Sequence, residues 1–209
     1  DLGAPARAMA FLTNGTLVSV GWDKVIRFWD IEKLGQIKSL DTDINMISLA
    51  VSPDGALLAV AESPNEGTTP TNVQIWDVAA GKEKLQLKGH SSRVVCLTFT
   101  NDGRGILAGG GQKNEFSEIS YWDLATGQLR GNHKTPKKWW FETVAVNIDD
   151  RRVAAVSVSG MAFYDLDFLI NERTWPAHGN TASCGVFANG GATLITAGWD
   201  KSIKVWNTR

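Results

Sequence analysis

The chain has 209 residues, of which 43% are hydrophobic and 21% are charged, and its formal net charge is −1. This length accommodates one or two globular domains with a buried core, and no apolar run approaches the roughly 20 residues of a membrane-spanning helix. The near-neutral charge argues against general nucleic-acid binding, which needs a clustered positive excess to displace counterions.

Five segments, taken in chain order, end in an aromatic residue followed by aspartate or asparagine. The aromatic markers are Trp29, Trp76, Trp122, Tyr164 and Trp206. Successive markers are 47, 46, 42 and 42 residues apart. A fixed period in the forties is the signature of a repeat array. The expected repeat units cover about residues 6–41, 43–90, 91–134, 137–178 and 179–209.

Each unit is expected to consist of short antiparallel strands joined by tight turns. The first turns of the units are Asn14-Gly15, Pro53-Asp54-Gly55, Asn101-Asp102-Gly103, Asp149-Asp150 and Asn189-Gly190-Gly191. These residue types tolerate the positive φ angles of hairpin turns. After the marker, a second turn such as residues 79–82 leads to a fourth strand such as residues 83–87.

The last unit shows the pattern most clearly. Residues 181–187 form a short apolar and β-branched run, and residues 193–197 form a second one. Residues 202–206 alternate polar and apolar side chains, as expected for a third strand. The sequence stops shortly after this strand, so the last unit is expected to lack an outer fourth strand.

In its period, turns and aromatic markers, the chain resembles the WD40-repeat family over essentially its whole length. The resemblance implies an all-β fold, a β-propeller of WD40 type, with residues 1–209 as a single propeller region. It implies five four-stranded antiparallel blades, the last one incomplete. Because this family mostly forms rings of roughly seven or eight blades, we expect part of a larger ring. A compact five-bladed ring and completion of the open edge by another chain are the alternatives.

The resemblance also implies a buried hydrogen-bond tetrad in the last unit, made of His178, Thr196, Asp200 and Trp206. The aspartate would accept a hydrogen bond from the histidine. The histidine would bond the threonine hydroxyl, which would in turn reach the indole N–H. Every buried polar group would then have a partner.

Parts of the same tetrad are expected in the first and third units, at Ser19, Asp23, Trp29, His90 and Trp122. Leu2 stands where the histidine of the first unit should be. In the third unit, the run of glycines at 109–111 occupies the expected hydroxyl and turn positions. The fourth unit has no tetrad that the sequence reveals.

The resemblance implies that the loops before the inner strands and those between second and third strands share one face, the top. Candidate partner-binding residues on that face are Trp22, Trp199, Lys137, Lys138, Trp139 and Trp140. Exposed tryptophan with flanking charge is the composition of an interface hot spot. The plainer interpretation is that a tryptophan before the turn aspartate packs on its neighbour. The expanded loops 62–72 and 112–117 are interpreted as tolerated insertions rather than binding loops.

Catalytic and metal sites are not expected. A serine-protease-like triad of His178, Thr196 and Asp200 is better explained as the buried tetrad. The three histidines lie in different blade connections without ligand spacing, so no metal or other cofactor is expected.

Cys96 and Cys184 occupy the same slot in two non-adjacent units, too far apart for a disulfide. Both are expected as small core residues.

The sequence therefore predicts a non-enzymatic scaffold that binds a protein or peptide partner through its top-face loops. The alternative is a regulatory or sensory segment of a larger multidomain enzyme. A sugar-binding or glycoside-processing propeller is a weaker alternative, because the inner strands carry almost no carboxylates. Stacking of single-stranded nucleic acid on Lys137, Lys138 and the adjacent tryptophans is disfavoured by the net charge. A cytoplasmic location is expected, since no signal peptide is visible.

Overall fold

The computed structural model describes residues 5–62, 70–112, 115–136, 140–157, 160–167 and 169–208. These residues form five antiparallel sheets, numbered here as blades 1 to 5 in chain order. Four blades contain four strands each, and the last contains three. No helix in these described ranges is long and apolar enough to cross a membrane.

The strands follow the chain from the inner to the outer edge of each blade. Blade 1 contains β1 (Ala6–Phe11), β2 (Leu17–Gly21), β3 (Val25–Asp30) and β4 (Gly35–Asp41). Blade 2 contains β5 (Met46–Val51), β6 (Leu57–Glu62), β7 (Val73–Asp77) and β8 (Lys82–Leu87). Blade 3 contains β9 (Arg93–Phe99), β10 (Gly105–Gln112), β11 (Phe116–Asp123) and β12 (Leu129–Thr135).

Blade 4 contains β13 (Phe141–Val146), β14 (Arg152–Ser157), β15 (Gly160–Asp165) and β16 (Asn171–Trp175). Blade 5 contains β17 (Ala182–Ala188), β18 (Thr193–Gly198) and β19 (Ile203–Asn207), with a 3₁₀ turn at Asn189–Gly191. The predicted all-β fold of propeller-type blades is confirmed, including the three-stranded last blade.

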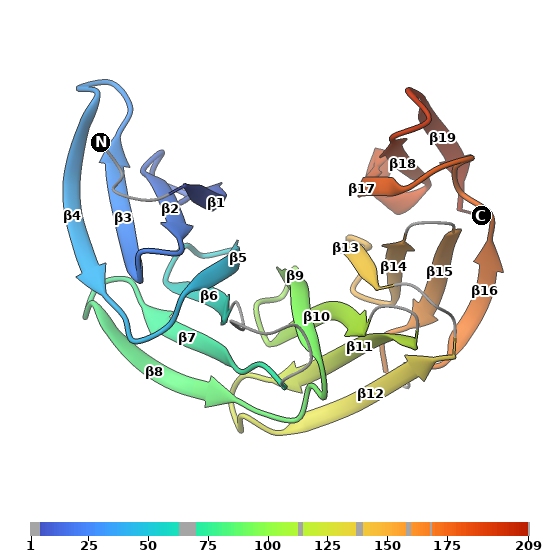
Figure 1. The fold of residues 1–209 in the computed structure, drawn as a ribbon, viewed down its shortest axis with the longest axis horizontal. Coiled ribbons are helices and arrows are strands. Elements are labelled where there is room, and N and C mark those ends of the chain that lie inside the picture. Colours follow the sequence, from blue (N-terminus) through green and yellow to red (C-terminus); the bar gives the residue numbers. More distant parts are fainter. Residues whose placement is uncertain are drawn as a thin grey trace.

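The blades stand side by side in an open arc (Figure 1). The first strand of each blade lines the inner side of the arc, and β4, β8, β12 and β16 form its outer rim. Blade 1 and blade 5 lie at the two ends, with a wide gap between them. The arrangement differs from the compact five-bladed ring that the sequence left open as an alternative.

The aromatic markers hold neighbouring blades together. Each marker of blades 1 to 4 lies at an irregularity in the pairing of the third and fourth strands, which re-aims a side chain. Trp76 packs in the core shared with blade 1, Trp122 in the core shared with blade 2, and Tyr164 in the core shared with blade 3. Each of these markers therefore contacts the preceding blade.

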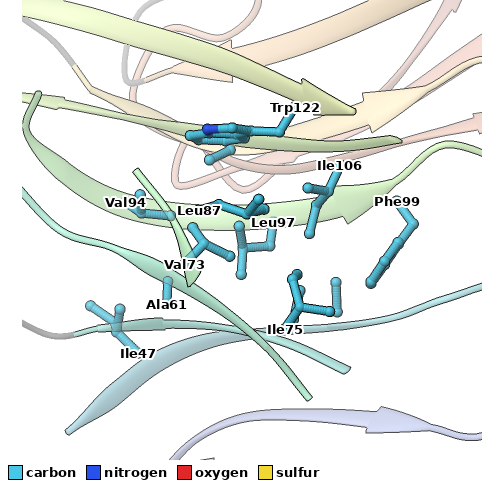
Figure 2. Close-up of a cluster of buried hydrophobic side chains, with 13 residues drawn as sticks. Ile47, Ala61, Val73, Ile75, Leu87, Val94, Leu97, Phe99, Ile106 and Trp122 are labelled. Carbon is cyan, nitrogen blue, oxygen red and sulfur yellow. The ribbon is translucent and has the colours of Figure 1, made fainter. Parts of the chain in front are cut away.

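The core between blades 2 and 3 illustrates this packing (Figure 2). Val73 and Ile75 of β7 face Val94 of β9 and Ile106 of β10, and the Trp122 indole closes the cluster. All five side chains are buried. Side chains of β7 and β10 therefore pack in a buried interface between two blades. The sequence pattern alone could not distinguish this buried face of the strands from a solvent-exposed one.

At the two ends of the arc, apolar side chains are exposed at positions that are buried between neighbouring blades elsewhere in the arc. Met9 and Phe11 of β1 are 66% and 57% exposed, and Ile203 and Val205 of β19 are 74% and 68% exposed. Counted back from the marker, Ile203 and Val205 hold the positions of the buried Val73 and Ile75 of blade 2. These two surfaces are the end faces of the arc.

The cysteine prediction is half right. Cys96 and Cys184 are both free; Cys96 is buried between blades 3 and 4, where burial raises the pKa of its thiol to about 12. Cys184, predicted as a core residue, is exposed. The reason is that the side of blade 5 on which it lies is an end face.

The glycine run of β10 is explained by close approach rather than by a turn. A Cβ added at Gly109 would lie 2.7 Å from Val144 Cγ1 and 2.8 Å from Cys96 Sγ, and one at Gly110 would overlap the Arg93 carbonyl oxygen. Only a residue without a side chain lets β10 lie this close to its neighbours.

The substitution Gly110→Ala should destabilise the chain by roughly 1–3 kcal/mol, because the obstructing atom is backbone and cannot rotate away. Urea unfolding followed by tryptophan fluorescence measures the change. Gly35→Ala is the matched control: its φ is ordinary and its nearest neighbour, Lys33 O, is 3.8 Å from the added carbon. Equal stability of the two variants would contradict the close-approach explanation.

Candidate functional site

The tetrad residues of blade 5 lie in one continuous hydrogen-bonded chain. His178 Nδ1 is 2.9 Å from Asp200 Oδ1, and His178 Nε2 is 2.8 Å from Thr196 Oγ1. The Trp206 indole donates to the same hydroxyl over 2.9 Å. Since an indole N–H can only donate, the threonine hydroxyl accepts from Trp206, and it also bonds His178 Nε2. On the other side of the ring, His178 Nδ1 donates to the Asp200 carboxylate.

Asp200 anchors the top of this chain. It accepts hydrogen bonds from the Ser202 hydroxyl at 2.6 Å, from His178, and from the backbone N–H of Gly179 at 3.0 Å. These bonds, that from Ser202 first, hold the pKa of Asp200 well below its usual value. Thr196 is only 1% exposed, and its hydroxyl is fixed between an imidazole and an indole. Such a hydroxyl cannot reach a substrate, so the geometry is structural.

Blade 1 contains only part of the chain. The Trp29 indole donates to Ser19 Oγ over 2.8 Å, and Asp23 pairs with Arg27 at 2.6 Å in place of a histidine. Leu2, which stands at the histidine position in the sequence, lies outside the described residues. Arg27 therefore supplies the cation that balances the turn aspartate.

Blade 3 differs from the prediction that His90 and Trp122 share a tetrad. The Trp122 indole donates instead to the backbone carbonyl of Lys88 at 2.8 Å, and His90 Nδ1 is 2.8 Å from Ser120 Oγ. Strand pairing places Ala108 opposite Ser120, just as Thr196 lies opposite Lys204 in blade 5. With no hydroxyl at Ala108, nothing can bridge the imidazole and the indole, and each finds a separate partner.

A buried carboxylate completes the blade 3 network. Glu118 is fully buried on β11, with Oε2 3.5 Å from His90 Nε2. It accepts hydrogen bonds from the Ser91 backbone N–H and hydroxyl, the Ser92 hydroxyl and the Asn132 amide, at 2.7–3.0 Å. The sequence prediction did not include Glu118. A charge cannot be buried unpaired, so these donors are what permit it.

Burial governs the ionisation of this pair. Desolvation lowers the pKa of His90 to about 4, against the opposing effect of Glu118, so the ring stays neutral near pH 7. Burial alone would raise the pKa of Glu118, but His90 and the donated hydrogen bonds outweigh it, and the pKa lies below its usual value. Near pH 7 the network therefore pairs a neutral imidazole with a carboxylate whose charge is stabilised by hydrogen bonds from the protein.

The sequence prediction did not consider the residue two positions before each marker, which in blades 1 to 3 bonds a polar group of an incomplete tetrad. In blade 2 that residue is Gln74, which accepts from the Trp76 indole at 3.1 Å and donates to Asp43 at 3.0 Å. In blades 1 and 3 it is Arg27 and Ser120, the partners of Asp23 and His90. A polar residue at this position thus predicts how an incomplete tetrad is satisfied.

The top face is the edge where first strands begin, second strands end and third strands begin. Trp22 follows β2, Trp199 follows β18 and Trp140 precedes β13, so all three lie at this edge. Trp199 is 70% exposed and Trp22 is 48% exposed. Trp140 is half-buried, and its indole donates to Glu142 Oε1 over 2.6 Å. The remaining candidates, Lys137, Lys138 and Trp139, lie outside the described residues.

Trp22 is also a local packing partner, as the plainer interpretation expected. The Arg7 guanidinium lies 4.8 Å from the centre of its ring, within cation–π range. About half of the ring nevertheless remains open to solvent. Across the part of the chain that the structure describes, no group of three or more His, Cys, Asp or Glu side chains could hold a metal ion.

Known proteins share the repeat architecture. The family model described as "WD domain, G-beta repeat" matches residues 3–30, 81–114 and 170–207. Autophagy-related protein 16 of Arabidopsis thaliana is 24% identical over 201 residues, which is 94% of this chain and 37% of that protein. Transcription factor unc-37 of Caenorhabditis elegans is 25% identical over 206 residues, covering 95% and 31%.

Target of rapamycin complex subunit wat1 of Schizosaccharomyces pombe (strain 972 / ATCC 24843) is 28% identical over 127 residues. That match covers 57% of this chain and 36% of the relative. The chain thus spans about a third of the length of these curated relatives.

Thr196→Val should lower the free energy of unfolding by about 1–3 kcal/mol, because it keeps the shape and leaves a buried indole N–H and imidazole nitrogen without a partner. Thermal or urea denaturation measures the loss. Thr193→Val on the same strand is the control, since Thr193 is half-buried and its hydroxyl accepts only from Asn189. A Thr196 variant as stable as the control would show that the chain of bonds contributes nothing.

Acid should destabilise the fold through His90. Its pKa is about 4 when folded and 6.5 when exposed, so between these values only the unfolded chain binds the proton. Unfolding is therefore favoured as pH falls, by about 2–3 kcal/mol from pH 7 to pH 4. Glu118, with its lowered folded pKa, adds to the loss below about pH 4.5.

Urea denaturation repeated across this pH range gives the slope, and His90→Asn should flatten it. His133→Asn is measured alongside, because desolvation also lowers the pKa of the half-buried His133, which therefore contributes in the same direction. A slope that survives in His90→Asn would assign the acid sensitivity elsewhere.

Proposed function

Because the chain belongs to the WD40-repeat family, we propose that it is a non-enzymatic interaction scaffold that holds a protein or peptide partner on its top face. The observation that carries the proposal is the pair of exposed tryptophans, Trp22 and Trp199, at the same edge of blades 1 and 5. Large aromatic side chains left open to solvent at one edge are typical anchors of protein interfaces.

The way the blades are built supports a platform role. The buried tetrad near Trp199 joins β18 and β19 to the segment before β17 through His178, Thr196 and Trp206. Fixing the segments on both sides of a loop lowers the ordering entropy that binding would otherwise cost. One relative, the target of rapamycin complex subunit, carries a name that places it in an assembly.

A catalytic role has less support. The five inner strands carry a single carboxylate, Glu142, whereas glycoside hydrolysis uses a pair. The matching family model describes a repeat and not an enzyme. The binding role needs only the aromatic and basic residues that the top face presents.

The end faces support a wider assembly. We infer that further blades of the same kind, in this polypeptide or in another chain, cover the apolar side chains of β1 and β19. Met9, Phe11, Ile203 and Val205 hold positions at which interior blades meet. A cytoplasmic location belongs to the same proposal, and it is supported by two free cysteines, one of them exposed.

The binding role is tested with a phage-displayed random dodecapeptide library selected on the immobilised chain. Peptides recovered from it should bind Trp199→Ala and Trp22→Ala about tenfold or more weakly than the unmodified chain, because each change removes an exposed anchor. Fluorescence anisotropy of labelled synthetic peptides measures the dissociation constants. Thermal melts check that each variant unfolds as cooperatively as the unmodified chain.

Leu34→Ala is the control for loss of an exposed apolar side chain. Leu34 is 89% exposed and lies in the turn between β3 and β4, at the edge opposite the top face. If the peptides distinguish none of the three variants, the top face is not the binding surface.

A further inference from the structure

The side of blade 1 that faces away from blade 2 matches the side of blade 3 that packs on blade 2. Strand pairing gives each residue of the first set a counterpart in the second. The two sets are Met9, Phe11, Leu17, Ser19 and Trp29 in blade 1 and Leu97, Phe99, Ile106, Ala108 and Trp122 in blade 3. The blade 3 set is buried in the core shared with blade 2, whereas Met9 and Phe11 are exposed. The blade 1 set forms the blade 1 face.

The side of blade 5 that faces away from blade 4 matches, in the same way, the side of blade 2 that packs on blade 3. Strand pairing again aligns the two sets residue by residue. They are Val186, Ile195, Ala197, Ile203 and Val205 in blade 5 and Ala50, Ala59, Ala61, Val73 and Ile75 in blade 2. The blade 2 set is buried, whereas Val186 is 58% exposed and Ile203 and Val205 are more exposed still. The blade 5 set forms the blade 5 face.

The chain therefore exposes both halves of an interface that it already forms internally, between blades 2 and 3. Within one copy the two faces do not meet, because blades 1 and 5 lie at the two ends of the arc with a wide gap between them (Figure 1). Between copies, the blade 5 face of one molecule can contact the blade 1 face of another. A contact between two different patches of the same chain is heterologous, or head-to-tail.

Neither face contains a charged side chain that association would remove from water. The Trp29 indole N–H donates to Ser19 Oγ at 2.8 Å, so the polar groups of the blade 1 face already have partners. Arg27, which shares the Trp29 side of β3, is paired with Asp23 at 2.6 Å. Burial of the exposed apolar side chains then favours association without a large polar cost.

We propose that a second copy of this chain covers each end of the arc, with the blade 5 face of one copy packed on the blade 1 face of the next. Val205 then packs beside Trp29, as Ile75 lies in one cluster with Trp122 between blades 2 and 3 (Figure 2). This inference rests on the proposed covering of the end faces by blades of the same kind, and it names the chain that supplies them.

Analytical ultracentrifugation of the chain at rising concentration tests the proposal. The average mass of the unmodified chain should rise above that of the monomer. Met9→Glu on the blade 1 face and Ile203→Glu on the blade 5 face should each weaken association about tenfold or more, because each places a charge in an apolar contact. A chain that stays monomeric at every concentration, or variants that associate as well as the unmodified chain, would overturn the proposal.

Ile148→Glu is the matched control, because Ile148 is 66% exposed but lies in the turn between β13 and β14, outside both faces. It should associate like the unmodified chain, and an equal loss in this variant would reveal general apolar attraction and contradict the proposal. Thermal melts followed by circular dichroism check the fold of each variant. Phe11→Glu and Val205→Glu replace the first pair of variants if either of those fails to fold.

Mixing the two blocked variants tests the direction of the contact. Met9→Glu keeps a free blade 5 face and Ile203→Glu keeps a free blade 1 face, so each is monomeric alone. Their mixture should form a one-to-one dimer that grows no further, since the remaining two faces are blocked. A like-with-like contact predicts the opposite result: one variant dimerises alone and the mixture adds nothing. That result would overturn the head-to-tail arrangement.

Leu34 separates a copy of this chain from a four-stranded blade as the covering element. Its counterpart in blade 4, Leu169, also lies five residues after the marker and is buried beside Gly131 of β12, the fourth strand of blade 3. Blade 5 has three strands in the described part of the chain, so a second copy leaves Leu34 exposed. Leu34→Asn should therefore not change association. A loss equal to that of Met9→Glu would place the contact elsewhere and overturn the proposed packing.

This inference and the proposed scaffold function fail in different ways. Peptide binding that depends on Trp22 and Trp199, in a chain that stays monomeric, overturns the self-association alone. Head-to-tail association in a chain whose selected peptides ignore both tryptophans overturns the top-face function alone. The two measurements use separate variants on separate surfaces, so neither result can stand in for the other.

Discussion

The arc depends on one repeated contact, the packing of the marker aromatics of blades 2 to 5 against the preceding blade. A four-stranded sheet cannot bury both of its faces alone, so a blade is stable only between neighbours. The bulge beside the marker turns the ring out of its own sheet and toward the preceding blade, as Trp122 shows in the core with Val73 and Ile75 of blade 2. Where no neighbour stands, as at β19, the same positions are exposed.

Burying a tryptophan creates a polar problem, because its indole N–H must find an acceptor. Four blades bury or half-bury such a ring and solve the problem in different ways. The acceptor is Thr196 in blade 5, Ser19 in blade 1, Gln74 in blade 2 and the Lys88 carbonyl in blade 3. The fold therefore requires a satisfied donor and not a particular set of residues. In blade 3, where the indole bonds a backbone carbonyl, His90 bonds Ser120 and lies beside the buried Glu118.

The stability of the blades and the recognition of a partner depend on different parts of the fold. The hydrogen-bonded tetrads and the apolar cores lie between strands, whereas Trp22 and Trp199 project from loops after the second strands of their blades. Residues at such places are free to suit a partner while the blades keep their packing.

The sequence by itself determined the repeat period, the number of blades, their turns and the composition of the complete tetrad in blade 5. These features are local, because each depends on residues within one unit and on the periodic pattern of polar and apolar side chains. Only the tertiary structure decided that Trp122 bonds a backbone carbonyl, that Glu118 is buried, that Cys184 is exposed, and that the arc is open. Each of these depends on which blade lies beside which, or on a backbone atom common to every residue.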